Sequence, residues 1–206
     1  MSQLIDLGDP NLKTVVERLK PVNGYCVMVD VVGSTALKDR DVRQWVIRLG
    51  NTFNHVRAWV APQILKVVGD MLMYWFPDTT FYSTASPLLL LRGLNELHAD
   101  RADWAAPVRA AAVRCENVYE IAFLRGQPDV YGKDIDLSAR LLGLAREGET
   151  VMDARFRVVV ARQYEVCRDK SEFGVVSRIE GPIEAKAGEL KGFPADIHYY
   201  RLPSPQ

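Results

Sequence analysis

Residues 26–35 read Cys-Val-Met-Val-Asp-Val-Val-Gly-Ser-Thr, a run of apolar and β-branched residues interrupted by Asp30 and closed by a glycine turn. A second segment, residues 64–76, reads Ile-Leu-Lys-Val-Val-Gly-Asp-Met-Leu-Met-Tyr-Trp-Phe and carries Asp70 directly after a glycine. Both runs predict apolar strands with a carboxylate at the tip. Burying a carboxylate is costly unless a positive group meets it, and two adjacent carboxylates repel each other. Because one or two divalent cations relieve both problems, the segments indicate metal-assisted chemistry on a phosphate.

The composition is that of an ordinary globular protein. The chain has 206 residues, of which 48% are hydrophobic and 25% charged, and we expect one domain over 1–206 with a full core. Lys+Arg and Asp+Glu both number 26, so no net charge favours nucleic acid or a membrane surface. The sequence shows neither an apolar run near the ~20 residues of a membrane span nor a secretory signal. With three widely spaced cysteines read as reduced thiols, we expect a cytoplasmic protein.

Periodicity and turn residues predict the order of the elements. The expected elements are a helix at 11–20, a strand at 25–31, one long helix through 42–60, a hairpin at 64–67 and 71–76, a helix at 86–97, a second hairpin at 108–115 and 118–123, a helix at 134–146, and strands at 150–152, 164–167 and 198–202. Hairpins mixed with helical crossovers predict an α/β (α+β) fold of the ferredoxin-like, polymerase-palm type. We expect a mixed, largely antiparallel sheet with helices on one face, and the other face, near the two carboxylates, left for substrate or a second subunit.

Three further segments carry candidate chemistry. Residues 31–35 lead into a helix, and their backbone N–H groups are placed to cradle a polyphosphate. In residues 129–140, Asp136 and Arg140 lie four apart on a helix, which is consistent with a surface ion pair or with an arginine aimed at a phosphate. Lys191 precedes a glycine and, taken alone, is most simply a solvated turn residue. The basic residues at 155–162 are interpreted as a solvated helix face.

Taken in order, four motifs strongly resemble a class III nucleotidyl cyclase homology domain. They are Asp30-Val-Val-Gly-Ser-Thr, Lys66-Val-Val-Gly-Asp70, Asp129-Val-Tyr-Gly with Ser-Ala-Arg140-Leu, and Leu-Lys191-Gly-Phe-Pro. The resemblance covers a core of about residues 25–202. It implies a head-to-tail homodimer with its active sites at the interface, so that a monomer is inactive.

The resemblance also implies roles for individual residues. Asp30 and Asp70, helped by the backbone carbonyl of Val31, fall where two Mg²⁺ or Mn²⁺ ions are held, and Lys66 and Asp129 fall where the family reads the base. Arg140 falls on the transition-state arginine and Lys191 on the lysine that holds the terminal phosphates. The substrate-binding set is Gly33, Ser34, Thr35, Lys66, Asp129, Asp136 and Lys191. The implied reaction is attack of the ribose 3′-hydroxyl on the α-phosphorus, with pyrophosphate leaving.

The sequence departs from the family pattern at two places. Asp136 stands where the family usually has Asn, and an ionised carboxylate accepts hydrogen bonds but cannot donate them. It either pairs with Arg140, accepts from a ribose hydroxyl, or lies away from the site. Residues 114–116 read Arg-Cys-Glu where many members carry His-x-Gly. The Lys66 and Asp129 pair nevertheless matches the adenine-reading pattern.

A short chain without membrane spans, sensor domain or helical transducer resembles the pyrimidine cyclases of bacterial Pycsar antiphage systems, whose cyclic UMP or cyclic CMP is read by a separate effector protein. The expected enzyme is therefore a uridylate cyclase, with UTP ahead of CTP. The alternatives are an adenylate cyclase that uses ATP and a catalytically silent cyclase-fold scaffold. A diguanylate cyclase is discounted because its hairpin reads Gly-Gly-Asp/Glu-Glu-Phe, whereas residues 68–72 read Val-Gly-Asp-Met-Leu.

Overall fold

The computed structural model describes residues 3–6, 8–58, 64–78, 91–94, 96–97, 104–167, 180–185, 190–193 and 197–203. In chain order, its elements are β1 (Gln3–Leu4), α1 (Leu12–Glu17), β2 (Val22–Val31), α2 (Ser34–Arg40), α3 (Val42–Ala58), β3 (Ile64–Val68), β4 (Met71–Pro77), β5 (Val108–Leu124), β6 (Gln127–Tyr131), α5 (Lys133–Leu142), β7 (Thr150–Asp153), α6 (Ala154–Cys167), β8 (Glu180–Glu184) and β9 (His198–Leu202). The expected helix at 86–97 begins outside the described residues. No helix in the described part of the chain is long and apolar enough to cross a membrane.

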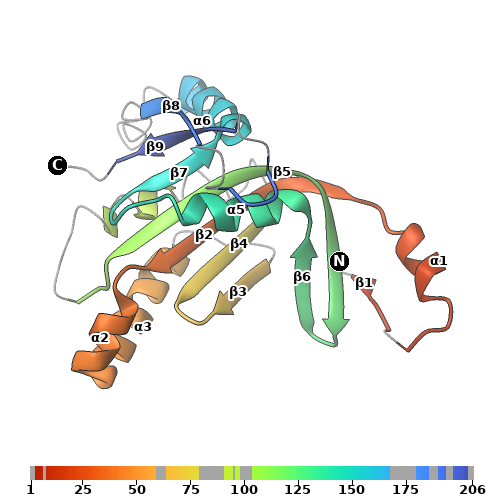
Figure 1. Cartoon of the computed structure of the whole chain (residues 1–206), viewed down its shortest axis with the longest axis horizontal. Helices are drawn as coiled ribbons and strands as arrows, with labels where there is room; N and C mark the ends of the chain where they lie inside the picture. The colour runs from red at the N-terminus through yellow and green to blue at the C-terminus, as the bar shows by residue number, and fades with distance from the viewer. Residues whose placement is uncertain are drawn as a thin grey trace.

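The strands described here form one mixed sheet. Its path runs β3–β4–β2–β5–β7–β9–β8, and β1 and β6 pair with the far half of the long strand β5. Only the β1–β5 and β5–β7 pairs are parallel among the described pairings. The predicted mixed, largely antiparallel sheet is therefore confirmed. In Figure 1 the β5–β6 hairpin extends beyond the central strands and passes beside β3.

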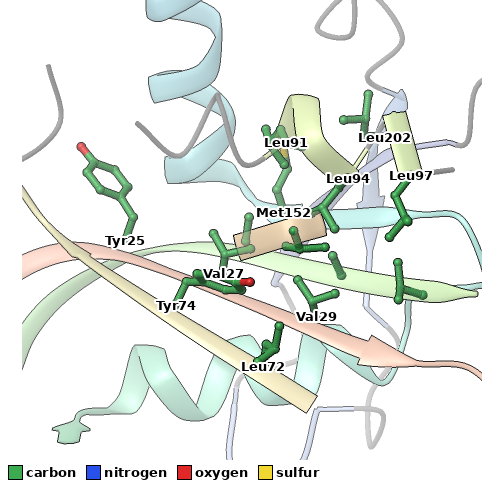
Figure 2. Packing of buried hydrophobic residues seen from close by; sticks show 14 of the residues in the cluster. Tyr25, Val27, Val29, Leu72, Tyr74, Leu91, Leu94, Leu97, Met152 and Leu202 are labelled. Atoms are coloured by element: carbon green, nitrogen blue, oxygen red, sulfur yellow. The ribbon is translucent and has the colours of Figure 1, made fainter. Parts of the chain in front are cut away.

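Both faces of the sheet carry helices. Alternate residues of β2 divide between the faces: Val27 and Val29 join a core cluster with residues of α3, α6 and the segment 91–97, and Figure 2 shows part of this packing. Cys26 and Met28 join the opposite cluster, where α5 contributes residues including Leu137 and Leu141. The expectation that helices cover one face is wrong, because the apolar stripe of α5 packs on the face expected to stay open.

The long helix predicted through 42–60 corresponds to α3, and a separate short helix, α2, which the periodicity did not predict, precedes it. The backbone at Asp41 is extended, with φ −160° and ψ 101°. Its carboxylate Oδ1 accepts hydrogen bonds from the backbone N–H of Arg43 and of Gln44, at 2.9 and 3.1 Å. Asp41 thus satisfies the first free N–H groups of α3, which is the role of a helix N-cap.

The second predicted hairpin, at 108–115 and 118–123, is wrong. Residues Val108–Leu124 form the single strand β5, which passes through Asn117 in the left-handed region at φ 54°. Its pairing with β2 shifts register between Val22 and Gly24, which is a β-bulge rather than a turn. The hairpin is formed instead by β5 and β6, which are joined by a turn at Gly126.

Two further boundaries differ from the prediction. The expected strand at 164–167 belongs to α6, because Phe156 and Val160 lie four apart and bury one helix face in the core. Helix α5 spans Lys133–Leu142, so it begins one residue before and ends four before the predicted range 134–146.

Candidate active site

The two motif carboxylates lie at adjacent strand ends. Asp30 pairs with Met71 in the β2–β4 register, and the backbone N–H of Val31 donates to the carbonyl of Asp70 at 3.3 Å. Gly69 turns β3 into β4 at φ 63°, a conformation that favours glycine. Two residues far apart in the sequence are therefore brought close along the backbone of one strand pair.

Asp30 already has a positive partner, Arg109 of β5. The arginine stands directly opposite Asp30 in the β2–β5 register, and its Nε and Nη2 both donate to Oδ2, at 3.0 and 2.9 Å. The sequence motifs did not single out Arg109. The sequence does contain a signal for Arg109, because this charged residue interrupts the apolar run at 108–113 just as Asp30 interrupts the apolar run of its own strand.

The donor set at these strand ends fits a hard divalent cation in ligand type. Within the described residues, Oδ1 of Asp30 and the carboxylate of Asp70 have no hydrogen-bonding or ionic partner. Carboxylate and carbonyl oxygens are the ligands that Mg²⁺ and Mn²⁺ prefer, and Mg²⁺ commonly uses one or two carboxylates with water and substrate phosphates. No group of three or more His, Cys, Asp or Glu residues that could hold a metal occurs in the described part. A cation held by Asp30 and Asp70 would take its further ligands from groups such as the carbonyl of Val31, water and substrate phosphates.

In segment 31–35, which was predicted to bind phosphate, the side chain of Ser34 has a structural role. Gly33 precedes α2 in the left-handed region at φ 69°. Ser34 is buried, and its Oγ accepts a hydrogen bond from Nε1 of Trp45 at 2.9 Å. Thr35 is exposed. A phosphate contact from this segment is thus left to backbone N–H groups and Thr35.

Lys66 and Asp129 meet in space. The ammonium of Lys66 on β3 forms an ion pair with Oδ2 of Asp129 on β6. The same oxygen accepts from the hydroxyl of Tyr131 at 3.1 Å. The three side chains line a pocket of about 410 Å³ between β3 and the β5–β6 hairpin. The pairing of two residues expected to act together is a product of the fold, since their strands pack side by side.

Lys66, Asp30 and Arg109 project from the same face of the sheet as α5. Lys66 pairs with Met73, and Met73 belongs to the cluster that α5 covers. Asp30 lies two residues after Met28 on β2, and Arg109 lies two residues before Ala111 on β5. Since side chains alternate between the two faces of a strand, both point to the same face as Met28 and Ala111, which belong to the cluster under α5. All three are only partly buried. The end of this face near Asp30 therefore stays open, although α5 covers its middle.

The remaining candidates lie on α5 and the loop beside it. Asp136 and Arg140 are both exposed and, in the described structure, form no ion pair with each other. Lys191 is exposed, and the ammonium of Lys133 lies 5.2 Å from the ring centroid of Phe193, so that this loop contacts the start of α5. In the described part of the chain, Asp136, Arg140 and Lys191 therefore make no direct contact with the two motif carboxylates by hydrogen bond or ion pair.

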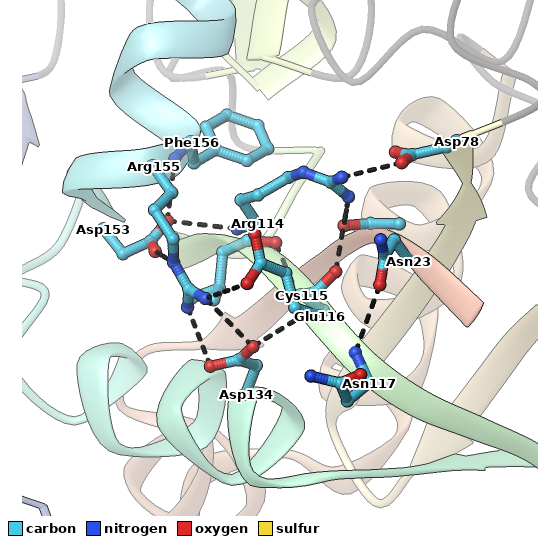
Figure 3. A network of polar contacts seen from close by, with 12 residues as sticks. Asn23, Asp78, Arg114, Cys115, Glu116, Asn117, Asp134, Asp153, Arg155 and Phe156 are labelled. Carbon is cyan, nitrogen blue, oxygen red and sulfur yellow. Dashed lines mark hydrogen bonds and ion pairs between the residues drawn. The ribbon is translucent and has the colours of Figure 1, made fainter. Parts of the chain in front are cut away.

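A polar network fixes the start of α5 (Figure 3). Arg155 donates to both oxygens of Asp134, at 2.7 and 3.2 Å, and to Oδ2 of the buried Asp153 at 2.9 Å. Burial lowers the pKa of Arg155, but hydrogen bonds and charge from the two carboxylates outweigh it and raise that pKa. The pKa of Asp153 is raised by burial, although hydrogen bonds from the backbone of Arg114 and Phe156 oppose the rise. Arg155 therefore stabilises the start of α5 through these ion pairs, rather than being part of a solvated helix face.

Comparisons with known proteins establish the fold. An adenylate cyclase from Trypanosoma brucei in its monomeric state superposes with a TM-score of 0.65 at 15% identity, over 90% of this chain and 93% of that one. The adenylyl cyclase CyaB from P. aeruginosa gives 0.58 at 17% identity, over 92% and 97%. The guanylate cyclase domain of RhGC from Catenaria anguillulae, in complex with GTP, gives 0.59 at 11% identity, over 90% and 98%. The chain has the fold of class III nucleotidyl cyclase domains.

Sequence comparisons find no relative. No protein-family model matches the chain. No curated protein matches it either. At identities of 11–17% the structural likeness shows the fold alone.

Proposed function

We propose that this chain is a metal-dependent nucleotidyl cyclase that converts a nucleoside triphosphate to a 3′,5′-cyclic nucleotide and pyrophosphate. The observation that carries the proposal is the pairing of the strand ends that bear Asp30 and Asp70. This pairing of strand ends supports a site for Mg²⁺ or Mn²⁺ between the two carboxylates, and the fold is shared with adenylyl and guanylyl cyclases. The whole chain, 1–206, is proposed to act as one catalytic domain.

Each group of side chains has a task in this proposal. Asp30, Asp70 and the carbonyl of Val31 hold the cations, which when bound activate the ribose 3′-hydroxyl and neutralise the triphosphate. Arg109 supplies positive charge beside Asp30. The segment 33–35 receives phosphate oxygens through backbone N–H groups.

A second group of residues completes the site from the partner subunit. Lys66 and Asp129 bind the base, Arg140 stabilises the charge that develops on the α-phosphate, and Lys191 holds the terminal phosphates. Arg140 and Lys191 are exposed and form no bond with Asp30 within the described residues, which is compatible with a head-to-tail homodimer that has its sites at the interface. Asp136, which is exposed and unpaired with Arg140, is available to accept from a ribose hydroxyl.

The favoured substrate is UTP, followed by CTP and then ATP. On this proposal the product, cyclic UMP, is a cytoplasmic second messenger in antiphage defence and is read by a separate effector. The support is the resemblance of the short chain to pyrimidine cyclases. Adenylate cyclase activity is the second candidate, because Lys66 and Asp129 form the pair that the adenine-reading pattern requires. A silent cyclase-fold scaffold is the third, and the unusual Asp136 favours it.

The test is incubation of the purified chain with Mn²⁺ and each of ATP, GTP, CTP and UTP separately, with products resolved by mass. We expect cyclic UMP or cyclic CMP from the wild type. In Asp70→Asn we expect the rate of product formation to fall by at least about a hundredfold, because a cation that loses a carboxylate ligand no longer stabilises the charge that develops on the phosphate. Asp39→Asn is the matched control, since Asp39 is an exposed acid on α2. Cyclic AMP as the main product selects the second candidate, and no product from any nucleotide selects the scaffold.

A further inference from the structure

The carboxylate of Asp129 is held at both oxygens. Oδ2 binds the ammonium of Lys66 and accepts the hydroxyl of Tyr131 at 3.1 Å. Oδ1 accepts the backbone N–H of Val130 at 2.9 Å. A carboxylate otherwise rotates easily about its terminal torsion, which has a broad energy profile. The Tyr131 hydroxyl therefore limits the directions in which the remaining lone pairs of Asp129 point.

Tyr131 is itself held in place. Its ring packs edge-on against Phe123, with centroids 5.3 Å apart and planes at 66°. Both rings line the pocket that contains Lys66 and Asp129. Although Tyr131 is 40% exposed, its partial burial and then the charge and hydrogen bond of Asp129 raise its pKa, so the phenol stays protonated and remains a donor.

The pocket offers complementary polar groups to a planar ligand. An ammonium only donates and a carboxylate only accepts, so the pair suits the edge of a nucleobase that presents an acceptor atom beside an N–H group. All four bases have such an edge, and they differ in where the two atoms lie. Discrimination therefore depends on how firmly the acceptor lone pairs of Asp129 are directed.

We propose that Tyr131 is a positioning residue that sets base discrimination by orienting the Asp129 carboxylate. The inference rests on the proposed function, because it takes the Lys66–Asp129 pocket as the base site. It adds a residue outside that pair and assigns it a measurable effect on selectivity rather than on the chemical step.

The experiment compares wild type, Tyr131→Phe and Tyr119→Phe. Tyr119 is the register partner of Tyr131 on β5 and does not line the pocket, so it is the matched control. Product ratios are measured in an equimolar mixture of ATP, GTP, CTP and UTP with Mn²⁺. In parallel, calorimetry measures the affinity of each α,β-methylene nucleotide, which binds without turnover.

We expect Tyr131→Phe to lower the preference for the best base over the second best by roughly tenfold, through KM and binding rather than kcat, since one hydrogen bond to a charged group is lost. Tyr119→Phe keeps the wild-type ratio. In an Asp129→Asn background, adding Tyr131→Phe changes the ratio no further, because the hydroxyl acts through the carboxylate. Melting temperatures show whether each variant is folded.

The outcomes separate the two proposals. A Tyr131→Phe ratio within twofold of wild type, or full additivity with Asp129→Asn, overturns the role of Tyr131. A wild type that binds the four analogues selectively but makes no product overturns the cyclase proposal, and the binding ratios still decide the role of Tyr131. A wild type that binds all four analogues equally, or none of them, overturns the base-site role of the pocket and with it the inference.

Discussion

Asp30 and Arg109 face each other across the β2–β5 pair, and two nitrogens of the guanidinium donate to one carboxylate oxygen, Oδ2. The ion pair offsets the energetic cost of placing the Asp30 carboxylate in an apolar strand. It also occupies Oδ2, so that a metal ion bound through Oδ1 would share the Asp30 carboxylate with Arg109.

Replacing Arg109 tests this competition. We expect Arg109→Gln to bind Mn²⁺ about fivefold more tightly than wild type without nucleotide, because the metal no longer competes with a partly buried ion pair worth about 1 kcal/mol. Electron paramagnetic resonance of free Mn²⁺ during a titration measures the affinity. Arg43→Gln on the exposed face of α3 is the control. Weaker Mn²⁺ binding in Arg109→Gln would mean that the arginine orients Asp30 for the metal instead.

Mixing two inactive variants tests the interface site. Asp30→Asn removes a metal ligand and Arg140→Ala removes the proposed transition-state cation, so each alone is expected to be inactive. In a head-to-tail dimer, half of the subunit pairs are mixed and each mixed pair contains one intact site, so activity returns to about a quarter of wild type. Product formation after mixing equal amounts of the two variants measures this. Activity no higher than that of the separate variants contradicts the shared site.

Ser34 is expected to matter for packing more than for substrate. Its Oγ accepts the Trp45 indole N–H at 2.9 Å, so Ser34→Ala costs about 1 kcal/mol of unfolding free energy. Catalytic efficiency stays within about threefold of wild type, because backbone N–H groups remain. Urea unfolding followed by tryptophan fluorescence, beside steady-state kinetics, checks both numbers. A loss of activity without a loss of stability places the hydroxyl on the substrate.

Arg155 is expected to stabilise the fold by joining α5 to α6. In Arg155→Gln, Asp134 and the buried Asp153 lose a shared cation. The expected loss is about 2 kcal/mol, below that of a fully buried pair because the side chain of Arg155 is 39% exposed. Chemical unfolding measures it. Arg162→Gln, on the exposed face of the same helix, is the control and is expected to change stability little.

Cys26 makes the stability depend on alkaline pH. Burial raises the pKa of its thiol from 9.0 to about 12, although a hydrogen bond with Ser138 opposes the rise. The folded chain therefore keeps a proton that the unfolded chain releases above pH 9, so the stabilisation is complete below that pH and is lost as pH rises toward 12.

Between pH 8 and pH 10.5, we expect the free energy of unfolding to fall by about 2 kcal/mol less in Cys26→Ala than in wild type. The absolute stability of the variant is lower at both pH values because a cavity remains, so the comparison uses the difference between the two. Equal pH dependence of the two proteins contradicts a shifted thiol.

Sequence patterns determined the strands that carry the candidate site. Apolar runs bounded by glycine are local signals, and they predicted β2, β3 and β4 with Asp30 and Asp70 at the correct ends. The order of the four motifs predicted the class III cyclase fold. A local signal misled at Asn117, a turn-forming residue that lies in the left-handed region inside β5 without ending the strand.

Only the tertiary structure decided which charges meet. The ion pairs Asp30–Arg109, Lys66–Asp129 and Arg155–Asp134 join residues on separate elements. Such contacts are set by strand register and by which helix packs on which face, and no residue spacing along the chain encodes them. The same reason explains why α5 covers a face expected to be open, since a helix stripe specifies that it is buried but not against which surface.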